Sequence, residues 1–358
     1  MTRVRPALPS DLEAIRAVSV RNGLSSFDPD ETRESWLAHP FREQFEGVPH
    51  GWVLESETGE VVGTFSNIHM LYELEGRQYK AGVAGSWAVD VEHRNASLRL
   101  ATAYFGQKGV DFCINGSASA VAARLMTAMK AQQVPSPDYD LSYFWLTNRR
   151  AFAAAALRKK KIPAAGLVSR IAALGLWAMD LGASRRTRSP AGIERLNRFG
   201  PESDAFWDKL RKSRGRLRAL RNSAALEWRF RTALDQKRAV ALGLWNGSEL
   251  RGYVVLRQFV RPHLGLKQFV IADLQALDDS PEVIRNLWAG ALQATSSEGM
   301  DALEWQGWHL SKRQMALSLN PRSYRYGVWP LYYKPVNPDL ASTLAQPDVW
   351  DFSPFDVF

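Results

Sequence analysis

Residues 240–254, VALGLWNGSELRGYV, carry the pattern that decides the fold: two apolar runs joined by an Asn-Gly turn at 246–247. Asn-Gly is typical of a tight β-hairpin, because both residues tolerate positive φ angles. Residues 52–65, WVLESETGEVVGTF, repeat this arrangement around a Thr-Gly turn at 58–59. The sequence therefore predicts a similar hairpin in each half of the chain.

Further landmarks recur at spacings of 189 to 192 residues and in the same order. They are a proline that opens a predicted helix, a glycine in the second hairpin strand, and a strand-like run that leads into a helix: Pro9 and Pro201, Gly63 and Gly252, and 109–114 and 299–304. Such self-similarity at a fixed offset indicates an internal repeat.

Each half reads as strand, helix, hairpin, strand, helix, strand and helix. This order predicts an α/β (α+β) protein made of two mixed β-sheet domains with flanking helices. The chain of 358 residues is long enough for two such cores. We expect a first domain over 1–150, a connector over 151–191 and a second domain over 192–358.

Composition favours a globular protein of a reducing compartment. Apolar residues make up 46% of the chain and charged residues 23%. The single cysteine, Cys113, leaves no intramolecular disulfide. Residues 1–8 lack the apolar core of a secretion signal, so we expect a cytoplasmic protein.

Positive charge is concentrated in the centre of the chain. Between Arg149 and Arg231 there are 21 Lys and Arg against 6 Asp and Glu, whereas the whole chain carries +9. This stretch is either a solvated connector or a dock for an anionic partner. Within it, 211–218 (RKSRGRLR) could bind an acidic acyl carrier protein. Nucleic acid ranks last as a partner, because no aromatic residues are interleaved with these cations.

The connector fits neither repeat. A basic cluster at 158–161 precedes the largely apolar run 162–183. Pro163, Arg170 and Asp180 argue against a transmembrane helix. Two interpretations stay open: a helix packed across both domains, or an interfacial helix that makes peripheral contact with anionic lipid at the inner membrane face.

A strand followed by a helix is predicted in 84–100, AGSWAVDVEHRNASLRL. Free amides and the dipole at a helix N-terminus favour pyrophosphate binding. This segment resembles the cofactor motif of the GNAT acyltransferase family, Arg/Gln-x-x-Gly-x-Gly/Ala. Arg94 takes the first motif position, while Ser97 and Arg99 stand at the two glycine-type positions.

The resemblance extends to Asn115 and Ala118, which match an Asn-x-x-Ala pattern of the family. The position of the family's proton-donating tyrosine is Ala122, and Tyr104 in the preceding helix is a poor substitute. The resemblance implies acyl-CoA as the donor, contacted by Val89, Val91, Arg94, Asn95, Ala96, Ser97, Leu98, Arg99 and Asn115.

The second half keeps the order of elements but loses the phosphate motif at 269–281. In fused GNAT proteins, one copy often shapes the acceptor site instead of binding the cofactor, and the resemblance implies this role for the second half. The ending at 350–356 also resembles the tails of tandem GNAT-like proteins encoded with surface-polysaccharide genes.

Acyl transfer to an amine requires a base that accepts the amine proton. Asp90, Glu92 and His93 follow the central predicted strand, and strand alternation places Asp90 and Glu92 on one face. The histidines lack the spacing of metal ligands, so no metal site is predicted. Nucleophile-elbow and P-loop motifs are absent from the sequence.

The resemblance therefore implies an N-acyltransferase that uses acyl-CoA and a small amine acceptor, for which an amino sugar or sugar nucleotide of surface-glycan synthesis is our best candidate. Two alternatives stay open. The donor is an acyl carrier protein instead of CoA, or the chain is a non-catalytic binding module with a GNAT fold.

Overall fold

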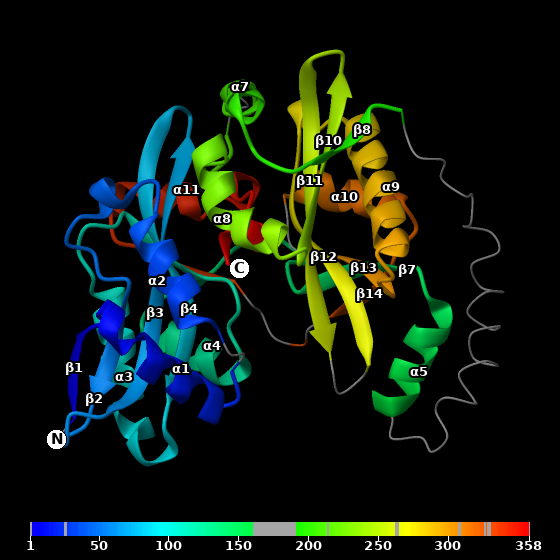
Figure 1. The fold of residues 1–358 in the computed structure, drawn as a ribbon. Helices are drawn as coiled ribbons and strands as arrows, with labels where there is room; N and C mark the ends of the chain where they lie inside the picture. The colour runs from blue at the N-terminus through cyan, green and yellow to red at the C-terminus, as the bar shows by residue number, and fades with distance from the viewer. Residues whose placement is uncertain are drawn as a thin grey trace.

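Two mixed β-sheets stand side by side and form the frame of the molecule (Figure 1). The structure is a computed structural model that describes residues 2–24, 27–159, 191–212, 215–261, 265–306, 309–325, 327 and 331–357. The predicted α/β class with two mixed sheets is confirmed. Both hairpins predicted from turn chemistry are present, as β2–β3 and β10–β11.

The first sheet is antiparallel except for one parallel pair, β4–β5. Its described strands run in the spatial order β1 (Arg3–Pro6), β2 (Gly51–Glu55), β3 (Val61–Leu74), β4 (Arg77–Val89), β5 (Phe112–Asn115), β15 (Tyr332–Pro335) and β6 (Gln132–Gln133), with β9 (Arg218–Ala219) paired to β3.

The second sheet repeats this plan, with β12–β13 as its parallel pair. Its described strands run in the order β14 (Arg322–Arg325), β7 (Leu141–Leu146), β13 (Ala302–Gln306), β12 (Leu266–Ala276), β11 (Glu249–Arg261), β10 (Ala239–Asn246) and β8 (Ile193–Leu196).

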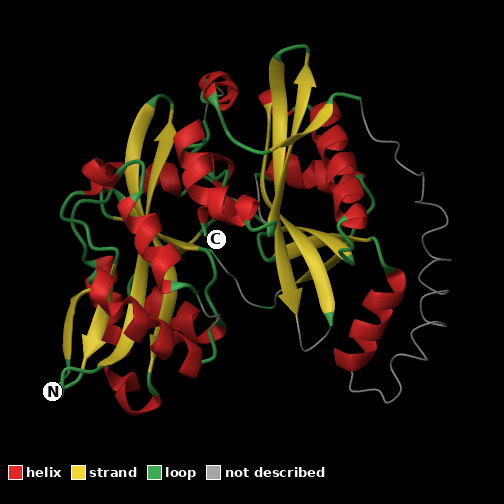
Figure 2. Ribbon diagram, in the orientation of Figure 1, coloured by secondary structure: helices red, strands yellow, loops and turns green. Residues whose placement is uncertain are grey.

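Helices cover the faces of both sheets, as Figure 2 shows. They are α1 (Leu12–Arg21), α2 (Pro29–Leu37), α3 (Ser97–Phe105), α4 (Ala120–Ala128), α5 (Arg149–Lys159), α7 (Pro201–Leu210), α8 (Ser223–Asp235), α9 (Pro281–Ser297), α10 (Leu310–Ser318) and α11 (Ala341–Leu344). None of the helices in these ranges has the length and apolarity that crossing a bilayer requires.

The two sheets exchange strands across the expected boundary at residue 150. Strand β7 belongs to the first 150 residues but pairs with β13 and β14 of the second sheet. Strand β15 comes near the end of the chain but lies between β5 and β6 of the first sheet. Separating the halves would therefore break β-ladders, and the division into 1–150, 151–191 and 192–358 stays a prediction.

The larger hydrophobic core also crosses between the halves. Tyr72 and Phe112 of the first sheet pack with ring centroids 5.3 Å apart, and Trp350 from the end of the chain lies 6.5 Å from Phe112. Phe206 of α7 and Phe230 of α8 belong to the same buried cluster. Helix α8 and the end of the chain therefore fill the space between the two sheets (Figure 1).

Candidate functional site

The parallel strands β4 and β5 diverge in the middle of the first sheet. They pair from Ala81 opposite Phe112 to Ala84 opposite Asn115, where β5 ends. Strand β4 continues to Val89 with a bulge, because two of its residues stand opposite one residue of β3 between Phe65 and Asn67. A bulge bends its strand. We call residues 85–89 and the end of β5 the first fork.

Side chains at the first fork are partly open to solvent. Residues 85–87 are half-buried, whereas Ala84 and Ala88 on either side are buried. The Trp87 indole packs on Phe65 with ring centroids 5.0 Å apart. Its Nε1–H is buried and has no hydrogen-bond partner among the described residues. No pattern in the sequence indicated this unpaired donor.

Tyr104 of α3 holds the two strands together where they part. Its hydroxyl lies 2.6 Å from the Gly82 carbonyl oxygen and 2.8 Å from that of Ile114. Tyr104 is fully buried, and burial raises the pKa of its phenol well above the usual value. Tyr104 therefore acts as a structural bridge and not as a proton donor, in line with its poor position in the sequence.

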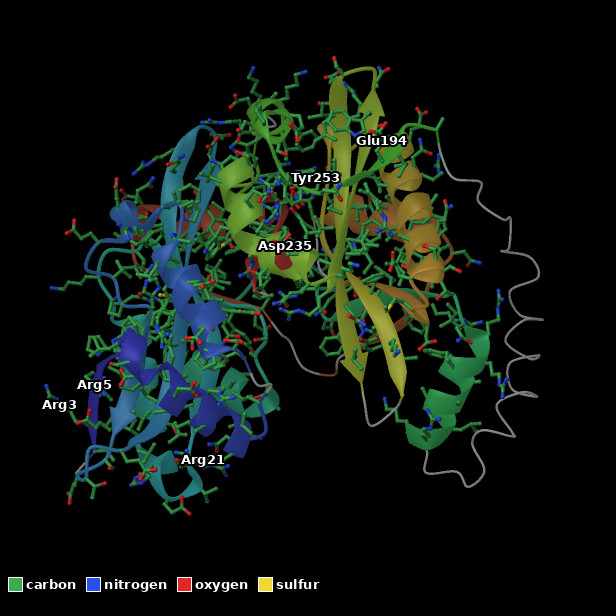
Figure 3. The ribbon with its side chains drawn as sticks, in the orientation of Figure 1. Arg3, Arg5, Arg21, Glu194, Asp235 and Tyr253 are labelled. Atoms are coloured by element: carbon green, nitrogen blue, oxygen red, sulfur yellow. The ribbon has the colours of Figure 1, made fainter. Side chains whose placement is uncertain are left out.

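The predicted shared strand face for Asp90 and Glu92 is wrong. Strand β4 ends at Val89, and the chain turns at once into a 3₁₀ helix, η3 (Val91–Ala96). The Asp90 carboxylate accepts hydrogen bonds from Arg21 Nε and Asn22 Nδ2, both at 2.8 Å (Figure 3 labels Arg21). The hydrogen bond from Arg21 is the main cause of the lowered pKa of Asp90. Asp90 thus ties α1 to β4 and is a weak base.

Most of the other predicted residues meet on one turn at the end of β4. Along η3 and the start of α3, Val91, Glu92, Arg94, Asn95 and Leu98 are exposed, His93 and Ser97 are half-buried, and Val89 and Ala96 are buried. The Ser97 amide already donates to the Arg94 carbonyl, so this helix start offers fewer free amides than predicted.

Two predicted contacts lie apart from this turn. Arg99 donates to the carbonyl oxygen of Thr2, so its guanidinium turns back toward β1 and away from the expected phosphate position. Asn115 is buried at the end of β5, and its Oδ1 accepts the Ser117 amide hydrogen. Asn115 thus shapes the chain where it leaves the first fork.

The second sheet has an equivalent fork beside residues 271–276 of β12. Strand β13 pairs with β12 only from Gln268 to Val270, and a bulge follows between Ile271 and Asp273. This second fork is filled by buried polar groups. Asp273 accepts hydrogen bonds from Arg221 Nε at 2.9 Å and from the Tyr253 hydroxyl at 2.7 Å, and all three residues are fully buried (Figure 3).

The end of the chain completes this network. Asp351 accepts from Arg218 Nε at 2.7 Å and from Lys312 Nζ at 3.0 Å. Burial alone would raise the pKa of Asp351, but Lys312 and Arg218 outweigh it and hold this pKa well below the usual value. Asp356 accepts a hydrogen bond from the Tyr72 hydroxyl at 2.7 Å, which joins the tail to the first sheet.

The predicted docking surface at 211–218 is engaged in part by ion pairs within the chain. Arg211 Nε donates to the buried Glu73 at 2.8 Å, Arg216 pairs with Asp279, and Arg218 is buried against Asp351. A run of basic residues is easily predicted to be solvent-exposed when the acidic residues that pair with it lie far away in the sequence. Residues 213–214 and most of the predicted connector, 160–190, lie outside the described residues.

Comparison with known proteins finds solved structures of similar architecture. No family profile matches the sequence, and no curated protein matches it. Among solved structures, a GCN5-related N-acetyltransferase from Anabaena variabilis aligns with a TM-score of 0.59 and 13% identity, over 94% of this chain and 73% of that chain. A protein from Enterococcus faecalis described as a probable N-acyltransferase gives 0.57 and 11%, over 94% and 73%.

Saccharomyces cerevisiae N-myristoyltransferase, solved with bound myristoyl-CoA, gives a TM-score of 0.58 at 10% identity, over 93% of this chain and 78% of that chain. At such identities the shared property is the fold. The chain therefore has the tandem α/β fold of GNAT-like proteins.

Within the ranges that the structure covers, no three His, Cys, Asp or Glu side chains gather in a way that could hold a metal ion.

Proposed function

We propose that this protein is an N-acyltransferase that holds acyl-CoA at the first fork. The observation that carries the proposal is the divergence of β4 from β5. It leaves the backbone of residues 85–89 without a strand neighbour on that side in the part of the chain that the structure describes. Unpaired strand edges pair readily with extended ligands. The amides of the pantetheine arm are such a ligand, and the unpartnered Trp87 Nε1–H offers an additional donor.

The donor phosphates would lie over the turn formed by η3 and the first turn of α3. The dipole of α3 favours anions there. Arg94 is exposed and can approach them, while Ser97 supplies a hydroxyl close to the helix start. Arg99 is assigned no part, because its guanidinium is bound to Thr2.

The second fork would bind no donor. Its polar groups are already paired with one another and with the end of the chain. The loop after β12 also carries Asp278 and Asp279 where the first half has its phosphate turn, and carboxylates repel phosphates. We therefore expect one acyl-CoA per chain and assign the acceptor side to the second half.

Catalysis would depend mainly on holding amine and thioester together. Glu92 and His93 remain the proposed proton acceptors, since both lie on the turn beside the first fork and Asp90 is engaged by Arg21. The proposed acceptor is a small amine, with an amino sugar or sugar nucleotide of surface-glycan synthesis as the candidate from the sequence resemblance.

The alternatives have less support. A carrier-protein donor has less support, because the arginines at 211, 216 and 218 of its predicted dock form ion pairs within the chain. A non-catalytic binding module remains a distinct outcome of the experiment below. A cytoplasmic protein is the proposed setting. The segment that the sequence offered for peripheral membrane contact lies outside the described residues, and both interpretations of it stay open.

Calorimetric titration with acetyl-CoA and longer acyl-CoAs tests the proposal. Wild type should bind one donor per chain. Arg94→Ala and Ser97→Glu should each weaken binding about tenfold or more, which corresponds to about 1.4 kcal/mol. Arg195→Ala, which removes an exposed arginine paired with Glu298 on the second sheet, is the matched control and should bind as wild type does. Absence of binding to every CoA would favour the non-catalytic module or a carrier-protein donor.

A further inference from the structure

Arg229 is a partly buried cation that has no counterion among the described residues. It lies on α8, between the two sheets (Figure 1). Its Nε donates to the Phe355 carbonyl oxygen at 2.9 Å. Its Nη2 is inaccessible to solvent and has no hydrogen-bond partner, and within the described ranges no carboxylate comes close enough to form an ion pair with it.

The surroundings of Arg229 increase this imbalance. Burial first, and then the neighbouring Arg257 of β11, lower the pKa of Arg229 to about 9, so the guanidinium is still charged at neutral pH. Asp356 is the carboxylate that most raises the pKa of Arg229. Its oxygens, however, accept hydrogen bonds from the Tyr72 hydroxyl and the Ser353 amide. Trp228 and Phe355 present aromatic rings 5.7 and 6.0 Å from the guanidinium carbon.

More deeply buried arginines of the same region are balanced. Arg221 lies 2.9 Å from Asp273, and Arg218 lies 2.7 Å from Asp351. Leaving a buried charge unpaired is costly, so each such group requires an explanation. A guanidinium with a free Nη2 and an aromatic wall is suited to binding a planar or tetrahedral acid group.

We propose that Arg229, with Arg257 beside it, binds a phosphate or carboxylate group carried by the acceptor. This inference rests on the proposed acyltransferase function and narrows its acceptor to an amine that also bears an acid group. Arg229 lies on α8 of the second half, to which we assign the acceptor side. The same helix faces the first half, because the Trp228 indole donates to the Ser35 carbonyl oxygen of α2 at 2.9 Å. The acid group of the acceptor would then be the counterion of Arg229.

Thermal unfolding with inorganic phosphate as the probe tests this site. The experiment compares wild type, Arg229→Met and Arg231→Met at constant ionic strength, with sodium chloride replaced stepwise by phosphate. Arg231 is the matched control, because it lies on the same helix and forms ion pairs with Asp235 and Glu227 near the surface. We expect phosphate to raise the Tm of wild type and of Arg231→Met by about 2 °C or more and to leave Arg229→Met unchanged.

Without phosphate, Arg229→Met should melt close to wild type, because loss of the hydrogen bond to Phe355 is offset by removal of an unpaired, partly buried charge. An equal phosphate response in Arg229→Met and wild type would overturn the site. The series is repeated with saturating acetyl-CoA. If phosphate still raises the Tm in the presence of acetyl-CoA, the assignment of Arg229 to the acceptor is supported. If the phosphate response disappears, Arg229 binds the phosphates of the donor, and the assignment to the acceptor is overturned. A phosphate response in a protein that binds no acyl-CoA would support the anion site and refute acyl-CoA as the donor.

Discussion

Acidification should destabilise this protein at a pH above that at which its carboxylates titrate, because of a stack of rings in which Phe45 and His69 are buried and Trp36 and His50 half-buried. Trp36 lies on His50 at 4.6 Å between centroids, His50 lies on His69 at 4.4 Å, and Phe45 covers the other face of His69 at 4.7 Å. His39 meets His69 edge-on at 5.9 Å. These three histidines lie within one apolar cluster.

Their hydrogen bonds favour the neutral form. His39 Nδ1 accepts the Phe41 amide hydrogen, and its Nε2–H therefore donates to the His69 carbonyl oxygen at 2.9 Å. Burial, followed by the neighbouring histidines, lowers the pKa of His69 to about 3 and that of His50 to about 4. Burial also lowers the pKa of His39.

These lowered pKa values determine how the free energy of unfolding changes with pH. The unfolded chain binds protons on histidine near pH 6.5, while the folded chain does not until far lower pH. The stabilisation is therefore complete above pH 6.5 and is lost as the pH falls toward the folded values. For His69 alone, moving from neutral pH to pH 5 costs about 2 kcal/mol, and the slope approaches about 1.4 kcal/mol per pH unit for each histidine.

Urea unfolding followed by tryptophan fluorescence between pH 7.5 and 5 measures this slope. His69→Phe keeps a ring in the stack and removes one proton-binding group, so its free energy of unfolding should depend less steeply on pH than that of wild type. Trp36→Phe, which keeps a ring in the same stack and removes no proton-binding group, is the control and should keep the wild-type slope. Equal slopes for wild type and His69→Phe would refute the reasoning.

Further predictions concern the buried network, the lone thiol and the second hairpin. Asp351→Asn leaves Lys312 without its buried counterion and should cost about 3–5 kcal/mol in urea unfolding; a loss below 1 kcal/mol would contradict the ion pair. Cys113 is fully buried, and burial raises its thiol pKa to about 12, so native protein should react with a thiol reagent only as fast as it unfolds. Gly252→Ala should lower the Tm more than Gly247→Asn, because a Cβ at 252 would lie 2.7 Å from the Gln275 carbonyl oxygen, whereas nothing lies near 247; equal Tm values would show that the strand yields.

Local patterns predicted the local structure. The turn residues predicted both hairpins. The second hairpin turns one residue later than expected, at Gly247 and Ser248, because Asn246 pairs with Glu249 and only Gly247 of the Asn-Gly pair has a positive φ. The order of elements then led to two mixed sheets. The exchange of β7 and β15 between the sheets could not be predicted, because it depends on pairing partners more than a hundred residues away.

The same distance in sequence explains the errors at the site. Asp90 looked like a strand residue because its partner Arg21 lies 69 positions earlier, and the strand ends one residue before it. The cations at 216 and 218 looked free because Asp279 and Asp351 come much later. Unpartnered groups such as Trp87 Nε1 become visible only when every neighbour is placed.

Hydrogen exchange with and without saturating acetyl-CoA tests most directly whether the first fork is the donor site. We predict slower amide exchange in 85–100 and 115–124, which contain the fork, the η3 turn and the start of α4. Exchange in 271–283, at the second fork, should be unchanged. Protection confined to 271–283, or no protection in 85–100 at saturating ligand, would contradict the account.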